Sequence, residues 1–172
     1  KAGEVLLAGS SVSNTGSIMV ENGLAILAAG GSLTLFSEDG DLSVSLSAEN
    51  AFGVVSDLAG QAVLQSGVVQ ASKAHFYGNQ ITHSGSVSAQ SVALANFSAV
   101  SASQGSVSTN VLSLSGGHDS KSGSSVDLSA KTNQVSTLSA NGFFDSLSVR
   151  SSSSMTVEST SKQTASAPAR AS

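Results

Sequence analysis

A short pattern that recurs along the chain constrains its fold more than any other feature of the sequence. It consists of a polar residue, Ser or Thr, glycine, a small residue and a β-branched residue, and it occurs at residues 14–18, 65–69 and 83–87. Glycine favours a turn, and β-branched residues favour a strand. Each copy therefore predicts a turn followed by the start of a short strand.

The similarity between copies extends beyond the turn. Residues 5–9, followed by Val12, match residues 74–78, followed by Ile81, with the same spacing to the next glycine. Self-similarity of this kind is the signature of stacked repeats, in which neighbouring units bury a common core. The sequence thus contains two copies of one supersecondary unit.

Apolar residues alternate with Ser and Thr through much of the remaining chain, which is the period of half-buried strands. These segments are residues 33–35, 42–46, 111–114, 126–128, 135–138, 147–149 and 155–157. No stretch has the 3.6-residue period and the caps of a helix. Asn-Gly pairs, which are typical of two-residue hairpins, occur only at residues 22–23 and 141–142, which is few for so many strands.

These features favour an all-β chain and a parallel coil over a sandwich of hairpins. We expect a right-handed parallel β-helix, that is, a solenoid of about eight coils with roughly 20 residues in each. Successive coils should stack about 4.8 Å apart. Residues 1–150 are expected to form the β-helix, and residues 151–172 a terminal strand with a flexible Ser/Ala-rich tail or linker.

The composition suits such a solenoid. Hydrophobic residues make up 40% of the chain but aromatic residues only 4%, so small aliphatic side chains must fill the core. With a net charge of −4 and scattered Lys and Arg, the chain has no basic stripe for phosphates, and nucleic acid is not an expected partner. The longest apolar run is shorter than the about 18 residues that span a bilayer. The lack of cysteine fits export as an unfolded chain.

Two stretches of the sequence carry a family resemblance. Residues 3–18 include Asn14-Thr15-Gly16-Ser17-Ile18, and residues 24–35 begin with an aliphatic strand that ends in Ala-Ala-Gly. Together they resemble the secretion-domain region of filamentous haemagglutinin-like exoproteins of two-partner secretion, and the resemblance covers about residues 3–95. The chain departs from the family pattern in lacking Asn-Pro-Asn motifs, because its only proline is Pro168.

The resemblance implies a right-handed β-helix that is exported through an outer-membrane transporter and is secreted or held at the bacterial cell surface. Family members act as adhesins, cytolysins, contact-dependent toxins or haem-acquisition proteins. We expect a structural or adhesive section of a rod-like stem, whose strand edges pair with neighbouring copies or further coils. The alternatives are a carbohydrate-active or carbohydrate-binding β-helix, with glycans as partners, and a haem-acquisition exoprotein. An autotransporter passenger, or a β-helix in a self-assembling surface fibre, would have a similar sequence.

The sequence contains no recognisable catalytic site, so we do not expect an enzyme, a cofactor or a metal ion. The densest group of candidate surface-binding residues is Lys73, His75, Tyr77 and His83. His75 and Tyr77 are two residues apart in a predicted strand and should share its outer face. A solvated outer strand explains the same pattern without any ligand.

Three further features of the sequence give weaker signals. The acidic turn at residues 38–41 has carboxylates that could bind Ca²⁺, but it lacks the spacing of known calcium loops, and a plain charged turn is the preferred interpretation. Residues 116–119 give a still weaker signal. Phe143 and Phe144 should place one ring inside the core and one outside, which indicates a packing role.

Overall fold

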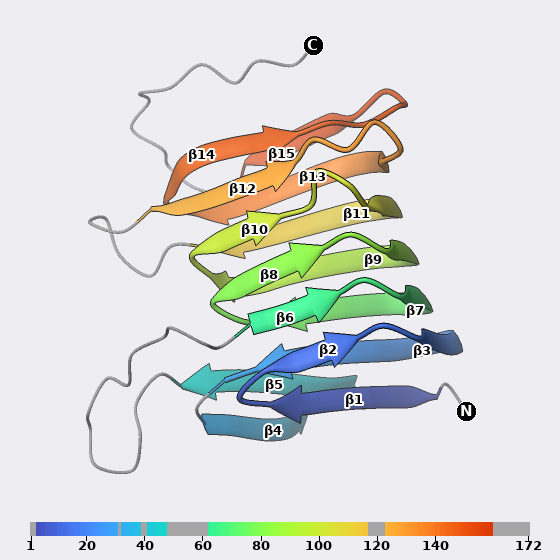
Figure 1. The fold of residues 1–172 in the computed structure, drawn as a ribbon, viewed down its shortest axis with the longest axis vertical. Helices are drawn as coiled ribbons and strands as arrows, with labels where there is room; N and C mark the ends of the chain where they lie inside the picture. Colours follow the sequence, from blue (N-terminus) through green and yellow to red (C-terminus); the bar gives the residue numbers. More distant parts are fainter. Residues whose placement is uncertain (1–2, 31, 39–40, 48–61, 117–122, 160–172) are drawn as a thin grey trace.

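The computed structural model describes residues 3–30, 32–38, 41–47, 62–116 and 123–159, and these residues form strands and no helix (Figure 1). Seven strands form one parallel sheet in the order β1-β3-β7-β9-β11-β13-β15. Their bounds are Glu4–Gly9, Ser17–Ala29, Val68–Tyr77, Ser86–Phe97, Ser106–Gly116, Gln134–Gly142 and Thr156–Ser159. We call this sheet the first sheet.

A second parallel sheet has six strands in the order β14-β12-β10-β8-β6-β2. Their bounds, from β14 to β2, are Phe144–Val149, Ser124–Leu128, Ala99–Ser101, Gln80–His83, Ala62–Gln65 and Val12–Asn14. Along the chain, each strand of the second sheet is followed by a strand of the first sheet. The prediction of an all-β chain with parallel strands is confirmed for the described residues, and this arrangement is consistent with a parallel β-helix or solenoid.

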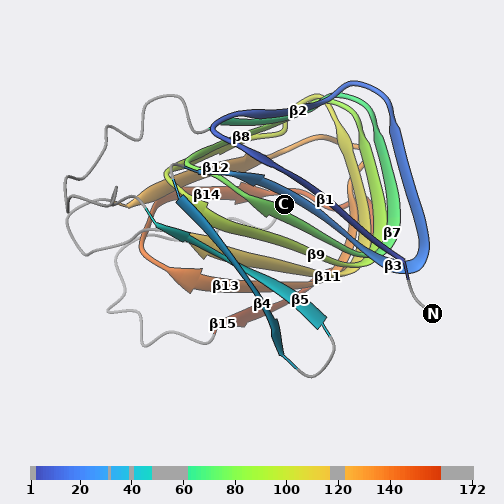
Figure 2. The same ribbon diagram turned by 90° about the horizontal axis from the view of Figure 1, so that it is seen from below.

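The strands are stacked one above another along the long axis of the molecule (Figure 1). Viewed along that axis, the outline has three sides, because the long strands of the first sheet bend into two arms (Figure 2). The bend lies where the register of paired residues skips one residue on each strand. These skipped residues include Ser72 on β7, Gln90 on β9 and Asn110 on β11. On β3, Asn22 lies at this bend with a positive φ of 54°, so the Asn-Gly pair at residues 22–23 forms a corner and not a hairpin.

The core consists of columns of small aliphatic residues stacked in register. Two such columns are Val12, Val63, Ile81, Val100 and Val126 in the second sheet, and Ala25, Ala74, Val92, Leu112 and Leu138 in the first sheet. All of these side chains are buried. Each buried Val, Leu or Ile stabilises the fold by about 1.5–3 kcal/mol before conformational entropy is considered. A core this narrow explains why the chain needs so few aromatic residues.

The register confirms the repeat seen in the sequence. Val12 and Ile81, which the sequence comparison aligned, both pair with Val63 on the strand between them. In the same way, Leu6 and His75 both pair with Ile26. Residues equivalent in the sequence therefore occupy equivalent places two turns of the chain apart.

The predicted strands at residues 33–35 and 42–46 are present, but their expected place in the parallel coil is wrong. They form an antiparallel pair, β4 (Ser32–Glu38) and β5 (Asp41–Ser47). This hairpin lies outside the first sheet, at the level of β1 and β3 (Figures 1 and 2). Because β4 and β5 form a separate sheet, the described residues contribute six strands to the second sheet, and not the about eight coils expected from the length.

The outward side of β3 is also apolar and buried near this hairpin. Leu24, Ile26 and Ala28 form a cluster separate from the main core, with Leu6 and Tyr77 packed against it. Ala25, Leu27 and Ala29, which alternate with them, face the main core. The second arm of β3 is therefore buried on both faces, unlike a half-buried strand with a solvated outer side.

Glycines stack directly upon one another at the turns that precede the long strands. A Cβ atom on Gly67 would meet the carbonyl oxygen of Gly16, and a Cβ on Gly85 would meet the carbonyl oxygen of Gly67. The obstacle in each case is backbone, which has little freedom to move. Successive turns can therefore approach this closely only where the residue has no side chain.

We expect Gly85→Ala to destabilise the protein by about 1–3 kcal/mol, because the added methyl group forces neighbouring turns apart. Gly16→Ala is the matched control, since a Cβ at Gly16 would have no atom within 4 Å. Its effect should stay within about 0.5 kcal/mol. Urea unfolding of both variants measures the difference, and equal stability of the two would contradict the stacking role of Gly85.

Candidate functional site

Three of the four candidate residues predicted from the sequence lie on one arm of β7. Lys73 is exposed, and His75 and Tyr77 are half-buried. The His75 and Tyr77 rings meet edge to face, with centroids 6.1 Å apart and an interplanar angle of 81°. The Tyr77 hydroxyl lies 3.4 Å from His75 Nδ1. The shared face expected for His75 and Tyr77 is therefore confirmed.

Burial raises the pKa of the Tyr77 hydroxyl above its ordinary value. Tyr77 also packs against the apolar cluster on the outward side of β3. Tyr77 therefore keeps its proton and contributes to packing on this surface. This arm of β7 carries polar and aromatic groups together.

His83 does not join the other three candidates, so it is not a surface-binding residue. Its side chain is only 6% exposed and lies on the inner side of β8. It occupies the same column as Asn14 and Gln65, which are also buried. The sequence pattern places all three two residues before the turn glycine, and that shared position was the signal for their common burial.

Hydrogen bonds satisfy much of this inner polar column, which we define as Asn14, Gln65 and His83. Asn14 Nδ2 donates to Gln65 Oε1 at 2.8 Å, and Gln65 Nε2 donates to the Gly67 carbonyl at 3.0 Å. His83 Nε2 lies 3.0 Å from the Ser106 carbonyl, which implies that Nε2 carries the proton. Polar groups buried at the turn thus hold neighbouring repeats together.

His83 is the least satisfied member of the column, because its Nδ1 atom is buried without a hydrogen-bond partner. Burial lowers the pKa of His83 below its ordinary value of 6.5, and the carbonyls of Ser106 and Gln65 offset part of that effect. The surrounding side chains include Phe76, Ile81 and Val107, none of which is charged. The imidazole is therefore held in its neutral form.

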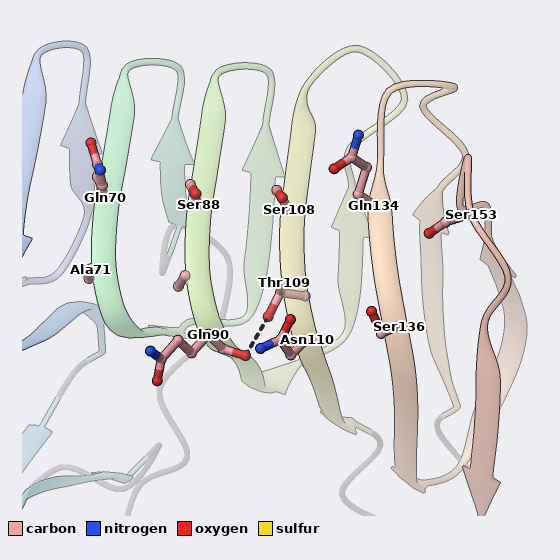
Figure 3. Close-up of a pocket in the computed structure, with 11 residues that line it drawn as sticks. Gln70, Ala71, Ser88, Gln90, Ser108, Thr109, Asn110, Gln134, Ser136 and Ser153 are labelled. Atoms are coloured by element: carbon pink, nitrogen blue, oxygen red, sulfur yellow. Dashed lines mark hydrogen bonds between the residues drawn. The ribbon is translucent and has the colours of Figure 1, made fainter. Parts of the chain in front are cut away.

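A hollow lies elsewhere on the surface, on the outer face of the first sheet. It crosses the first arms of β7, β9, β11 and β13 and has a volume of about 390 Å³ (Figure 3). We call it the outer groove. Its lining consists of Gln70, Ala71, Ser88, Ala89, Gln90, Ser108, Thr109, Asn110, Gln134, Ser136 and Ser153. None of these side chains is charged or aromatic.

The register of the strands explains why the outer groove is hollow. One outward-facing column runs across four neighbouring strands, in which each residue is the register partner of the next. From β7 to β13 it consists of Gln70, Ser88, Ser108 and Gln134. The two short serines thus lie between two longer glutamines, which form the walls (Figure 3). At the bend, Thr109 Oγ1 donates to the carbonyl oxygens of Gln90 and Val111, which lie 3.1 Å and 2.9 Å away. These bonds fix the backbone at the lower edge of the groove.

The remaining candidates contribute little to a site. Phe143 is 52% exposed and Phe144 packs against the core, as predicted for one outer and one inner ring. Glu38 and Asp41 are register partners at the end of the β4–β5 hairpin, while residues 39–40 and 117–122 lie outside the described residues. Within the part of the chain that is described, no group of three or more His, Asp or Glu residues could hold a metal ion.

Sequence reasoning missed the outer groove entirely. Its residues are ordinary Ser, Gln and Asn, and nothing in their types or local spacing separates them from other polar positions. Ser88 and Ser108 are 20 positions apart, but Gln134 follows 26 positions after Ser108, so no constant repeat length reveals the column. Only the pairing of strands shows that two short side chains lie between two long ones.

No protein-family model, curated protein or solved structure matches this chain. The described part of the chain has no helix long and apolar enough to cross a bilayer.

Acidification is expected to destabilise the protein through His83. Since its pKa is lower in the folded state than in the unfolded state, the unfolded chain binds a proton first as the pH falls. Stability should be constant above about pH 6.5 and decrease below it until the folded-state pKa is passed. Urea unfolding between pH 8 and pH 5 should show this decrease in the wild type and a smaller one in His83→Gln. An unchanged decrease in the variant would assign the effect to other groups.

Proposed function

We propose that this chain is a structural or adhesive section of an exported bacterial surface protein, and that its two sheets form one right-handed parallel β-helix. The main support is that one core is shared by the seven-stranded and six-stranded parallel sheets, which are connected by alternating strands. Such a stack grows in one direction as repeats are added, which suits a rod-like stem. Parallel crossovers within a sheet are right-handed in almost all proteins, and this supports the handedness.

The proposed family is that of the filamentous haemagglutinin-like exoproteins. It is supported by the resemblance of residues 3–95 and by the agreement between the repeat in the sequence and the register of the strands. In this proposal an outer-membrane transporter is the partner during export, and the protein is secreted or remains at the cell surface. A chain without cysteine, built from short strands with small side chains, suits passage as an unfolded polypeptide.

The last described strands support a role in end-to-end assembly. Leu147 on β14 lies over Val126, and Val157 on β15 lies over Leu138, so both occupy positions of the inner columns. They are nevertheless 41% and 60% exposed, whereas Val126 and Leu138 are buried. Among the described strands, β14 and β15 are also the last of their sheets, and edge strands can pair with another strand. A further strand pair, from a following coil or a second copy, would complete both ladders and cover these residues.

The proposal predicts concentration-dependent association of the purified chain that depends on this end. The double variant Leu147→Lys/Val157→Lys places two charges on the open end and should remain monomeric at concentrations where the wild type associates. Met19→Lys is the matched control, because Met19 is 69% exposed on the outer face of β3, away from the end. Sedimentation velocity measures the association, and electron microscopy shows whether the assemblies are linear.

Two results would contradict end-to-end assembly. In one, the wild-type chain remains monomeric over the whole range of concentration. In the other, the double variant associates as strongly as the wild type and Met19→Lys. Circular dichroism of each variant establishes that it keeps its strand content, so that a loss of association reflects the end and not the fold.

Carbohydrate binding is a second candidate function, and one observation favours it. The outer groove is lined only by amide, hydroxyl and methyl groups, which match a polyhydroxylated ligand better than the candidates on β7 do. The two functions are compatible, since an adhesive rod requires a ligand site on its outer face.

A further inference from the structure

The outer groove differs from the rest of the outer face in a way that favours a ligand. Ser88 and Ser108 form its floor, and Gln70 and Gln134 form its walls (Figure 3). A volume of about 390 Å³ falls within the range of small-molecule sites, which is about 300–1,000 Å³. The hollow is built from four strands of one sheet, so its floor is as rigid as the sheet itself.

The groove extends along the stack and does not end at β7. A second hollow of about 230 Å³ shares Gln70, Ala71 and Gln90 with the first and continues to Glu21 and Asn22 on β3. The two hollows together cross five neighbouring strands, perpendicular to the strand direction. A ligand that follows them would be an extended chain and not a single compact ring system.

The lining selects for a neutral and strongly hydrogen-bonding chain. Glutamine and asparagine amides offer both donors and acceptors, and serine and threonine hydroxyls do the same. Since the main hollow contains no Lys, Arg or His, it offers no countercharge to an anionic polymer, and Glu21 at the far end would repel one. The hollow also lacks the apolar surface that a lipid or an amphipathic helix would require.

We propose that the outer groove binds a linear, neutral glycan laid along the stack across β3, β7, β9, β11 and β13. Each repeat presents amide and hydroxyl groups at the spacing of parallel strands, about 4.8 Å, so successive sugar units meet similar partners. Because no aromatic ring lines the groove, hydrogen bonds must supply the affinity, and each contributes only modestly. Weak binding at one site suits a rod that presents many copies, since avidity then supplies the strength.

This inference rests on the proposed function, because it assigns a ligand class to the adhesive role of the rod. Its test is affinity electrophoresis of the full chain in gels that contain a soluble neutral β-glucan, with polygalacturonate as the anionic comparison. The wild type should be retarded by the neutral glucan and not by polygalacturonate. Retardation by polygalacturonate alone, or by neither polymer, would overturn the inference.

Variants locate the binding. Ser88→Ile/Ser108→Ile fills the floor of the groove with apolar groups and should weaken retardation by about tenfold or more, since several hydrogen bonds are lost. Gln70→Ala/Gln134→Ala removes the walls and should weaken it in the same direction without adding bulk. Ser13→Ile/Ser125→Ile is the matched control, because both serines are exposed on the second sheet. It should bind as the wild type does.

Equal retardation of the groove variants and the control would place the binding elsewhere and overturn the inference. The association of Leu147→Lys/Val157→Lys tests the open end and not the groove. A chain that associates end to end but binds no neutral glucan would therefore refute the glycan site alone. The opposite result would refute the assembly alone.

Discussion

Parallel backbone pairing in constant register is the interaction on which the rest of this structure depends. It keeps each inward residue over an inward residue, so that Val12, Val63 and Ile81 form one column although the first pair is separated by 51 positions. A slip of one residue would turn every side chain of a strand to the other face. The long segment between β3 and β6 leaves this register undisturbed, which agrees with the small entropic cost of lengthening a loop.

The turns before the long strands show how tightly the register is held. Stacked glycines bring neighbouring turns together, and the inner polar column of Asn14, Gln65 and His83 lies beside them. Gly105 continues the relation in the next repeat, because a Cβ there would meet the imidazole of His83. The pKa of His83 is thus linked to the packing of the stack.

Much of the fold could be predicted from the sequence because alternation and repetition are local signals. The column through Val12 and Ile81 and the late strands both follow from them. The β4–β5 hairpin was placed wrongly because a period of two is the same in parallel and antiparallel strands. The useful signal was the pair Asp39-Gly40, which has the composition of a two-residue hairpin loop and lies between the register partners Glu38 and Asp41.

The candidate site was less predictable, for a physical reason. Residue type suggested that His83 could bind a ligand, but its place in the column with Asn14 and Gln65 determines its burial. The outer groove depends on side-chain lengths on four different strands, and the unequal spacing from Ser88 to Ser108 and from Ser108 to Gln134 hides that relation in the sequence. Surface shape in a solenoid is a property of neighbouring repeats and not of any one repeat.

Disulfide cross-linking between β2 and β6, which are neighbours in the sheet but far apart in the sequence, tests the parallel register most directly. The native chain has no cysteine that could interfere. Ser13 on β2 is the register partner of Leu64 on β6, and Leu64 is the partner of Thr82 on β8. Neighbouring parallel strands are about 4.8 Å apart, within reach of a disulfide, whereas a separation of two strands exceeds its limit of about 7 Å. Mild oxidation should therefore cross-link Ser13→Cys/Leu64→Cys efficiently and leave Ser13→Cys/Thr82→Cys reduced. Failure of the first pair, or equal cross-linking of both, would contradict the stacked parallel sheets.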